Sequence, residues 1–88
     1  MTKVNANTKL GQSLIARANC NKGETLNQIY GKCSAAKKSA YDDCRRICAV
    51  EGGWNFHITS YNTMMFCIAF ETKNGTRLIT PTKSYLIA

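Results

Sequence analysis

The feature that most constrains the fold of this chain is a change of hydrophobic period at Gly52-Gly53. Before this pair, apolar residues recur at helical spacing. After it, they alternate with polar residues, as in a strand with one buried face. Glycine accepts the left-handed conformation in which many helices end, so the pair is expected to stop a helix. We therefore predict a helical half over residues 8–51 and a β half over residues 54–88.

The helical half is predicted to hold two or three helices. Thr8 can cap a helix that runs to about Asn19, a second short helix opens near Thr25, and Ser34 can cap a third that runs to about Val50. The residues expected to face the core are Leu10, Leu14, Ile15 and Ala18 in the first helix, Leu26, Ile29, Tyr30 and Cys33 in the second, and Ala36, Ala40, Cys44, Ile47 and Cys48 in the third.

The β half reads as an antiparallel meander. The predicted inward residues of its first strand are Trp54, Phe56 and Ile58. Residues 64–70 are apolar on both sides, which favours a central strand. Asn74-Gly75 predicts a type I′ hairpin turn before a strand over about 76–80. Pro81 interrupts that strand, because proline cannot donate to a ladder, and residues 85–87 are expected to form a short edge segment.

These elements predict one α+β domain over residues 1–88, with two or three N-terminal helices followed by a three- or four-stranded antiparallel β-meander. A chain of 88 residues has no room for two cores, and residues 1–7 are expected to form a flexible polar end. Helices on one side would leave the other sheet face open. We expect its centre at Met65, Cys67 and Ala69, where an apolar patch would suit a dimer or a partner.

Charge is the strongest global signal. Twelve Lys and Arg residues stand against five Asp and Glu residues, which gives a net charge of +7. Such a charge on a small body creates a field that attracts nucleic acid, a membrane surface or an acidic protein. The alternative is that the surplus charge serves solubility alone.

The third predicted helix concentrates part of this charge. Lys38 and Arg45 are seven residues apart, so they lie within about 20° of each other around the helix. Tyr41 lies between them, Arg46 further round, and Asp42 is spaced to pair with Lys38 or Arg46. Such a strip can hold phosphates or an acidic partner. The predicted partner-binding residues are Lys38, Tyr41, Arg45 and Arg46, with Lys73 and Arg77, which flank the hairpin, second.

The cysteines allow a metal site but do not favour one. There are five, an odd number, and we expect them to be free thiols in a reducing cytosol. Cys44 and Cys48 share a helix face and make half of a zinc site, which Cys20, Cys33 or His57 would have to complete. There is no C-x2-C knuckle, so we predict no metal and no cofactor, and keep a zinc-stabilised module as an alternative.

Catalysis is not predicted. The single histidine, His57, falls on the polar face of its strand, and no pair of acids is placed for general acid–base work. We read His57 as a surface residue without a role, and the protein as a non-enzyme. No stretch is long and apolar enough to span a membrane, and the first residues show no apolar signal segment. We expect a cytoplasmic protein.

Several segments together resemble small accessory proteins of phage and prophage genomes, from about residue 9 to the end. They are Lys22-Gly23 with Leu26 and Tyr30, Ser34 with Lys37 and Tyr41, residues 56–63 leading to Phe66, and Ser84-Tyr85-Leu86-Ile87. The resemblance transfers no functional residue. It implies a phage context, in which small proteins often act as anti-defence factors, anti-CRISPR proteins among them, by occupying a surface of a larger complex.

The leading hypothesis is therefore a phage-type inhibitor or modulator in the host cytosol. It would bind a host protein or nucleoprotein complex by steric occlusion through a basic surface, as a monomer or a homodimer. Direct DNA or RNA binding by the third helix is the first alternative. That alternative predicts an affinity that falls steeply with salt.

Overall fold

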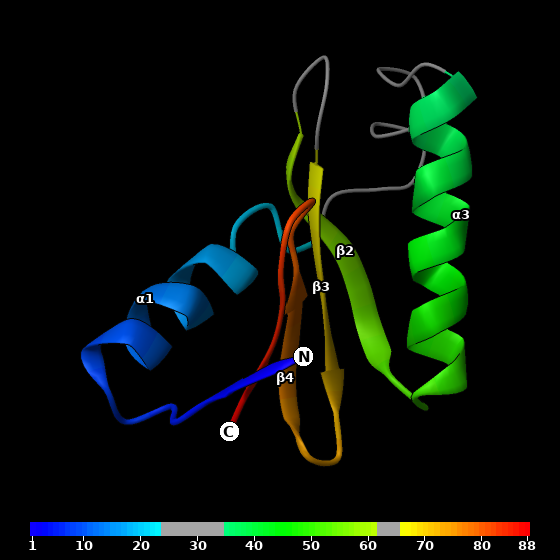
Figure 1. The fold of residues 1–88 in the computed structure, drawn as a ribbon. Helices are drawn as coiled ribbons and strands as arrows, with labels where there is room; N and C mark the ends of the chain where they lie inside the picture. Colours follow the sequence, from blue (N-terminus) through cyan, green and yellow to red (C-terminus); the bar gives the residue numbers. More distant parts are fainter. Residues whose placement is uncertain (24–34, 62–65) are drawn as a thin grey trace.

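A computed structural model describes residues 1–23, 35–61 and 66–88 of the chain. In these residues, two helices lie on opposite sides of one five-stranded sheet, as Figure 1 shows. The helices are α1 (Lys9–Ala18) and α3 (Ala35–Val50). The strands are β1 (Thr2–Val4), β2 (Trp54–Tyr61), β3 (Phe66–Thr72), β4 (Gly75–Ile79) and β5 (Ser84–Ile87), in the spatial order β1-β5-β4-β3-β2. The short helix predicted after Thr25 lies outside the described residues.

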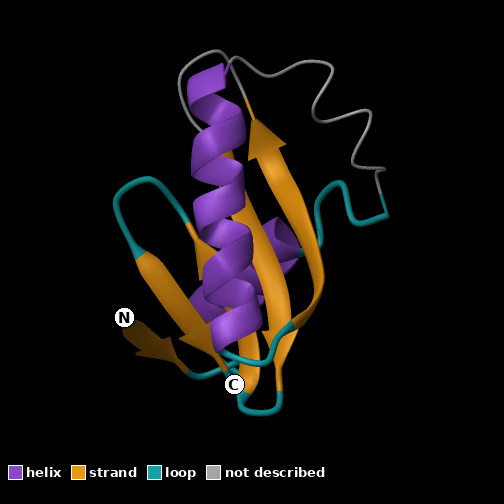
Figure 2. Cartoon of the chain, turned by 90° about the vertical axis from the view of Figure 1, so that its right-hand side faces the viewer, coloured by secondary structure: helices purple, strands orange, loops and turns teal. Residues whose placement is uncertain are grey.

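The N-terminal strand overturns the predicted layout. β1 pairs in parallel with β5, whereas the other neighbouring strands are antiparallel, so the sheet is mixed and has five strands. The predicted order of helices first, with three or four antiparallel strands after them, is wrong. The flexible start and the edge position of the last strand are wrong as well, because β1 lies outside β5 (Figure 2).

Backbone hydrogen bonds explain why the sequence did not reveal this strand. Thr2-Lys3-Val4 is too short and too polar to show an alternating pattern, and only Val4 packs against the core. Beyond the strand pairing, the Ala6 N–H donates to the Ala88 carbonyl at 2.8 Å, and the Ala88 N–H donates to the Val4 carbonyl at 3.1 Å. Every residue type except proline can make such bonds, so they leave no mark in the sequence.

Both described helices begin or end as their local chemistry predicts. The Thr8 hydroxyl accepts a hydrogen bond from the Gly11 N–H at 3.0 Å and caps α1. At the end of α3, the Gly53 N–H donates to the Cys48 carbonyl at 2.8 Å, and the Gly52 N–H donates to the Ala49 carbonyl at 3.1 Å. Gly52 has a φ of 68°. This pattern is a Schellman motif, and it confirms that the glycine pair stops the helix.

The β3–β4 hairpin is confirmed, but its turn differs from the predicted type I′. Thr72 pairs with Gly75, so Lys73 and Asn74 are the two central residues, and neither has the positive φ that a type I′ turn needs. The positive φ, 137°, falls on Gly75 instead. A Cβ atom there would lie 2.5 Å from the Ile87 carbonyl oxygen, so close passage of β5 also requires glycine.

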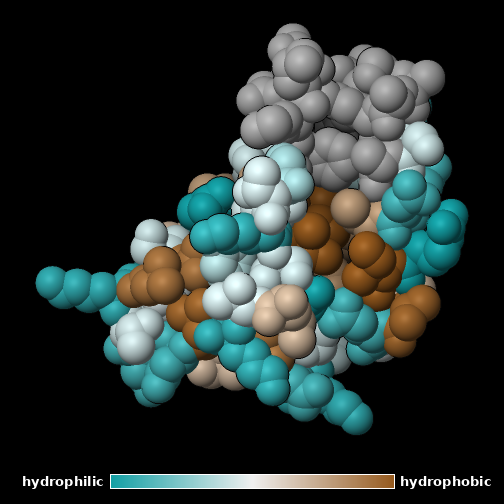
Figure 3. Space-filling view, in the orientation of Figure 1, coloured by the Kyte–Doolittle hydropathy of each residue, from teal (hydrophilic) through white to brown (hydrophobic). Residues whose placement is uncertain are grey.

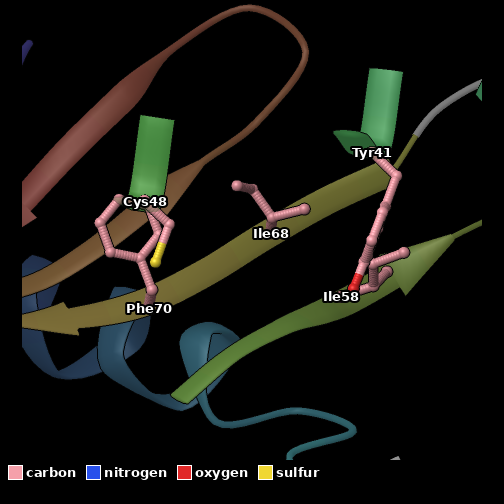
Figure 4. Packing of buried hydrophobic residues seen from close by; sticks show 5 residues of the cluster. All are labelled: Tyr41, Cys48, Ile58, Ile68 and Phe70. Carbon is pink, nitrogen blue, oxygen red and sulfur yellow. The ribbon is translucent and has the colours of Figure 1, made fainter. Parts of the chain in front are cut away.

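Each face of the sheet has its own apolar cluster. On the α3 side, Tyr41 and Cys48 pack down onto the strands, where the buried residues are Ile58, Ile68 and Phe70 (Figure 4). On the α1 side, the buried residues are Leu14, Ala18, Ala69, Leu78 and Ile87. β3 contributes to both clusters and lies between β4 and β2, which confirms that it is an interior strand, although β4 is the middle one. The predicted open face is wrong: Cys67 and Ala69 are buried on the side that α1 covers, and Met65 lies outside the described residues.

Candidate functional site

The exposed side of α3 holds three of the predicted contact residues. Lys38, Arg45 and Arg46 are exposed, and Arg46 forms an ion pair with Asp43 at 3.4 Å. This pair spans three residues, whereas the pairings of Asp42 with Lys38 or Arg46 that the sequence suggested would span four. The helix surface therefore carries both signs of charge.

Tyr41 does not belong to this exposed strip. It is 4% exposed, and its ring meets the ring of Phe56 edge to face at 5.1 Å. Tyr41 and Cys48 are seven residues apart and so lie about 20° apart around the helix, which places both on the inner face. The buried face of α3 is therefore rotated around the helix axis from the predicted one. Ile47, which was expected to be buried, is 41% exposed.

Tyr41 still acts on the site through Arg45. Burial raises the pKa of the Tyr41 phenol above 10.0, and a hydrogen bond from Arg45 and its positive charge partly oppose that rise. The phenol therefore stays neutral at physiological pH. Buried Tyr41 thus interacts with exposed Arg45, one turn further along the helix.

The two cations of the hairpin separate. Lys73 is exposed in the turn, whereas Arg77 is 6% exposed and cannot be a surface contact. The Arg77 guanidinium pairs with the Glu51 carboxylate at 2.9 Å and donates to the Tyr85 carbonyl at 2.7 Å. Its carbon lies 6.0 Å from the centre of the Phe70 ring. The strand register places Arg77 beside Phe70 on the α3 side, and Glu51, just past α3, makes burial of the charge tolerable.

A groove of about 350 Å³ runs between α3 and the start of β2. It is lined by Arg45, Cys48, Ala49, Gly53, Trp54, Asn55 and Phe56. Large apolar side chains are exposed at the same end of the molecule: Val50 is 82% exposed and Trp54 is 49% exposed. In Figure 3, hydrophobic surface reaches the outside at the lower end of α3. We call Arg45, Arg46, Val50 and Trp54 the corner patch.

Trp54 was predicted to be buried, and a bulge explains why it is not. Asn55 has a φ of 56°, and the pairing of β2 with β3 shifts register between Trp54 and His57. The extra residue breaks the alternation, so Trp54 no longer shares a face with Phe56. The available signal was Asn55 itself, because asparagine adopts positive φ more readily than most residues.

The Glu71 carboxylate anchors this end of β2. It accepts hydrogen bonds from Lys22 at 3.3 Å and from Asn55 at 3.1 Å. These bonds, with the Lys22 charge and a hydrogen bond from Trp54, hold the pKa of Glu71 below 4.5. The hydrogen bond from Asn55 ties the residue next to exposed Trp54 to β3.

His57 is buried, contrary to the surface position predicted for it. Its Nε2 lies 2.6 Å from the Ala18 carbonyl oxygen, and its Nδ1 lies 2.9 Å from the Asn55 carbonyl oxygen. The bulge at Asn55 turns the ring inward beneath the end of α1. Both ring nitrogens face backbone carbonyl oxygens, so His57 fastens α1 to the sheet.

Of the cysteines that the structure describes, Cys48 and Cys67 are buried and Cys44 is half-buried, as expected for core residues, whereas Cys20 is exposed. Burial, followed by the charge of Asp43, raises the pKa of Cys44. Burial, followed by the charge of Glu51, raises that of Cys48. His57 lies on the other side of the sheet from both, and Cys33 is outside the described residues. Among residues 1–23, 35–61 and 66–88, no three potential ligands gather at one metal site.

Two further findings concern the whole protein. Neither described helix is long and apolar enough to cross a membrane. Comparisons with protein-family models, with curated proteins and with solved structures found no match to this chain.

Proposed function

We propose that this protein binds another protein through the corner patch and acts by covering a surface of that partner. The observation that carries the proposal is the groove between α3 and the start of β2, which exposed Arg45 and Trp54 both line, with exposed Arg46 and Val50 at the same end of α3. The apolar side chains of Val50 and Trp54 leave surface in water that a partner could bury. Tryptophan and arginine are also the residue types that most often dominate binding energy at protein interfaces.

The charge pattern on α3 favours a protein partner over a bare nucleic acid. A polyphosphate backbone carries one sign of charge throughout, so carboxylates beside the cations of a helix weaken its attraction to that helix. Here Arg46 is paired with Asp43, and Asp42 is exposed on the same helix. Mixed charge around exposed apolar groups is the composition of a protein interface with a polar rim.

The net charge of +7 indicates the kind of partner. A positive field speeds encounter with an acidic surface and disfavours basic partners. The partner is therefore proposed to present an apolar pocket for Trp54 and Val50 with carboxylates at its edge, opposite Arg45 and Arg46. The resemblance to phage and prophage proteins makes a bacterial protein or nucleoprotein complex the partner to look for, and inhibition by occlusion the effect.

Capture of partners from a bacterial extract tests the proposal with matched variants. Immobilised wild type is compared with Trp54→Ala, with the double variant R45A/R46A, and with the control K3A/K9A, which removes the same charge elsewhere. Wild type and K3A/K9A should retain a specific partner. Trp54→Ala and R45A/R46A should retain at least about tenfold less of it, or none. Equal retention by all four proteins would refute the corner patch as the contact surface.

A separate measurement distinguishes nucleic-acid binding. Anisotropy with labelled single- and double-stranded DNA and RNA is recorded at ~50 and ~200 mM salt. The proposal expects no tight binding through α3 at either salt. Tight binding that collapses at the higher salt and is weakened by R45A/R46A would identify a nucleic-acid protein instead.

A further inference from the structure

A second hollow lies on the opposite side of the sheet from the corner patch. It has a volume of about 380 Å³ and lies between the end of α1 and the loop that joins β4 to β5. The lining residues with polar or ionisable side chains are Arg17, Cys67, Thr80, Thr82, Lys83 and Tyr85.

The α3 surface carries both signs of charge, whereas the charged residues that line the hollow are all positive. Arg17 and Lys83 both line it, and no carboxylate does. In the part of the chain that the structure describes, the Arg17 guanidinium donates to the Cys67 sulfur at 3.9 Å, and a thiol is a weak acceptor. Most of the guanidinium donors thus remain available to a stronger acceptor.

Both walls of the hollow are fixed before any ligand arrives. The Thr80 N–H donates to the Lys83 carbonyl at 2.8 Å, and the Lys83 N–H donates to the Thr80 hydroxyl at 3.0 Å. Pro81 further restricts the loop between them. On the other wall, buried Ala18 follows Arg17, and its carbonyl lies 2.6 Å from His57 Nε2. A site with fixed walls loses little entropy when it binds.

We propose that this hollow binds a phosphate group. The Arg17 guanidinium would take two phosphate oxygens as a fork, the Lys83 ammonium would add a second charge, and the Thr82 hydroxyl would donate a hydrogen bond. The site is independent of the corner patch. The phosphate can belong to a small phosphorylated molecule or to the backbone of a nucleic acid, and the recognising chemistry is the same.

The test is a titration of the ¹⁵N-labelled full chain, followed by NMR at constant ionic strength and pH. Inorganic phosphate and pyrophosphate are added to ~10 mM, a range that detects dissociation constants of millimolar order. The amide signals of Arg17, Thr80, Thr82 and Lys83 should shift together and saturate. Lys83→Gln should weaken binding about tenfold, the loss expected for one charge-assisted hydrogen bond.

Arg17→Gln should weaken binding as well, but Arg17 also lies in the last turn of α1, where a cation interacts favourably with the helix dipole and stabilises the fold. If Arg17→Gln unfolds the protein, phosphate binding by Lys83→Gln tests the proposal without it. Lys9→Gln is the charge-matched control and should bind like wild type. Absence of saturable shifts, or shifts that Lys83→Gln leaves unchanged, would overturn the proposal.

Two further ligands identify the source of the phosphate. Adenosine monophosphate binding more tightly than a ten-residue oligothymidylate would indicate a small phosphorylated ligand. The reverse order, with the same four amides shifting, would indicate a nucleic-acid backbone. Both results support the phosphate site. Shifts confined to other residues with both ligands would contradict it.

Discussion

Arg77 Nε donates to Glu51 Oε1 at 2.9 Å, and a terminal nitrogen of the same guanidinium lies 3.4 Å from Glu51 Oε2. This pair joins β4, inside the sheet, to the residue that follows α3. Because Arg77 is buried, the Glu51 carboxylate neutralises a positive charge that folding removes from water.

Glu51→Gln should therefore destabilise the fold. Losing a hydrogen-bonded charge pair of this kind costs about 2 kcal/mol of unfolding free energy. The matched control is Asp43→Asn, which breaks the exposed pair with Arg46 and should cost at most about 0.5 kcal/mol. Urea unfolding of the three proteins measures both values. An equal, small loss for the two variants would show that the Arg77 pair contributes little.

The glycine pair after α3 makes a second prediction, because its members are needed for different reasons. A Cβ atom at Gly53 would lie 2.5 Å from the Phe70 ring and 2.9 Å from the Cys48 sulfur, whereas at Gly52 it would meet open space. Gly52→Ala should cost about 1 kcal/mol for the left-handed backbone alone. Gly53→Ala should cost about 3 kcal/mol through overpacking. Thermal or urea unfolding measures the two losses of stability. A larger loss for Gly52→Ala than for Gly53→Ala would be inconsistent with this packing.

The acid limb of the stability profile should depend on Glu71. Its pKa is lower in the folded protein than the ordinary 4.5, so ionised Glu71 favours the folded state. That contribution is complete well above pH 4.5 and is lost as the pH falls through the lowered pKa. Glu71→Gln and Lys22→Gln should both flatten the loss of stability on acidification. Melting temperatures measured from pH 7 down to pH 3 provide the comparison; unchanged acid profiles in both variants would rule out this role.

Thiol reactivity should follow burial. Cys20 is exposed, whereas burial raises the pKa of Cys44 and Cys48, which leaves less thiolate at neutral pH. Timed alkylation with iodoacetamide, read by peptide mass spectrometry, should modify Cys20 first and Cys48 much later. The same reaction in denaturant, where the sites should react alike, is the control. Modification of Cys48 as fast as Cys20 in the folded protein would contradict the packing of α3.

The sequence predicted those features of the fold that depend on neighbours along the chain. The Thr8 cap, the stop at Gly52-Gly53 and the interior position of β3 each follow from a few adjacent residues. β1 did not, because backbone pairing with β5 needs no particular side chain. The sequence also did not predict that both faces of the sheet are covered, because no local pattern determines that α1 and α3 pack on opposite faces.

The contact residues were predicted less well, for a related reason. Exposure depends on what lies opposite a residue in space. Tyr41 is buried by Phe56, and Arg77 is buried because Glu51, distant in sequence, can neutralise it. Trp54 is exposed because one asparagine adds a bulge. Lys38, Arg45 and Arg46 are exposed, as most charged residues are, and their role as contacts stays a prediction.

The central claim is that the corner patch touches another protein, and site-specific photocrosslinking tests it most directly. The photoreactive residue p-benzoylphenylalanine replaces Val50, which is exposed enough to tolerate it, or Lys9, which is exposed on α1 across the sheet. In a bacterial extract, the Val50 probe should form a discrete adduct that Trp54→Ala removes, and the Lys9 probe should form none. An adduct of twice the chain mass would identify a second copy as the partner. Adducts from Lys9 but not from Val50 would contradict the account.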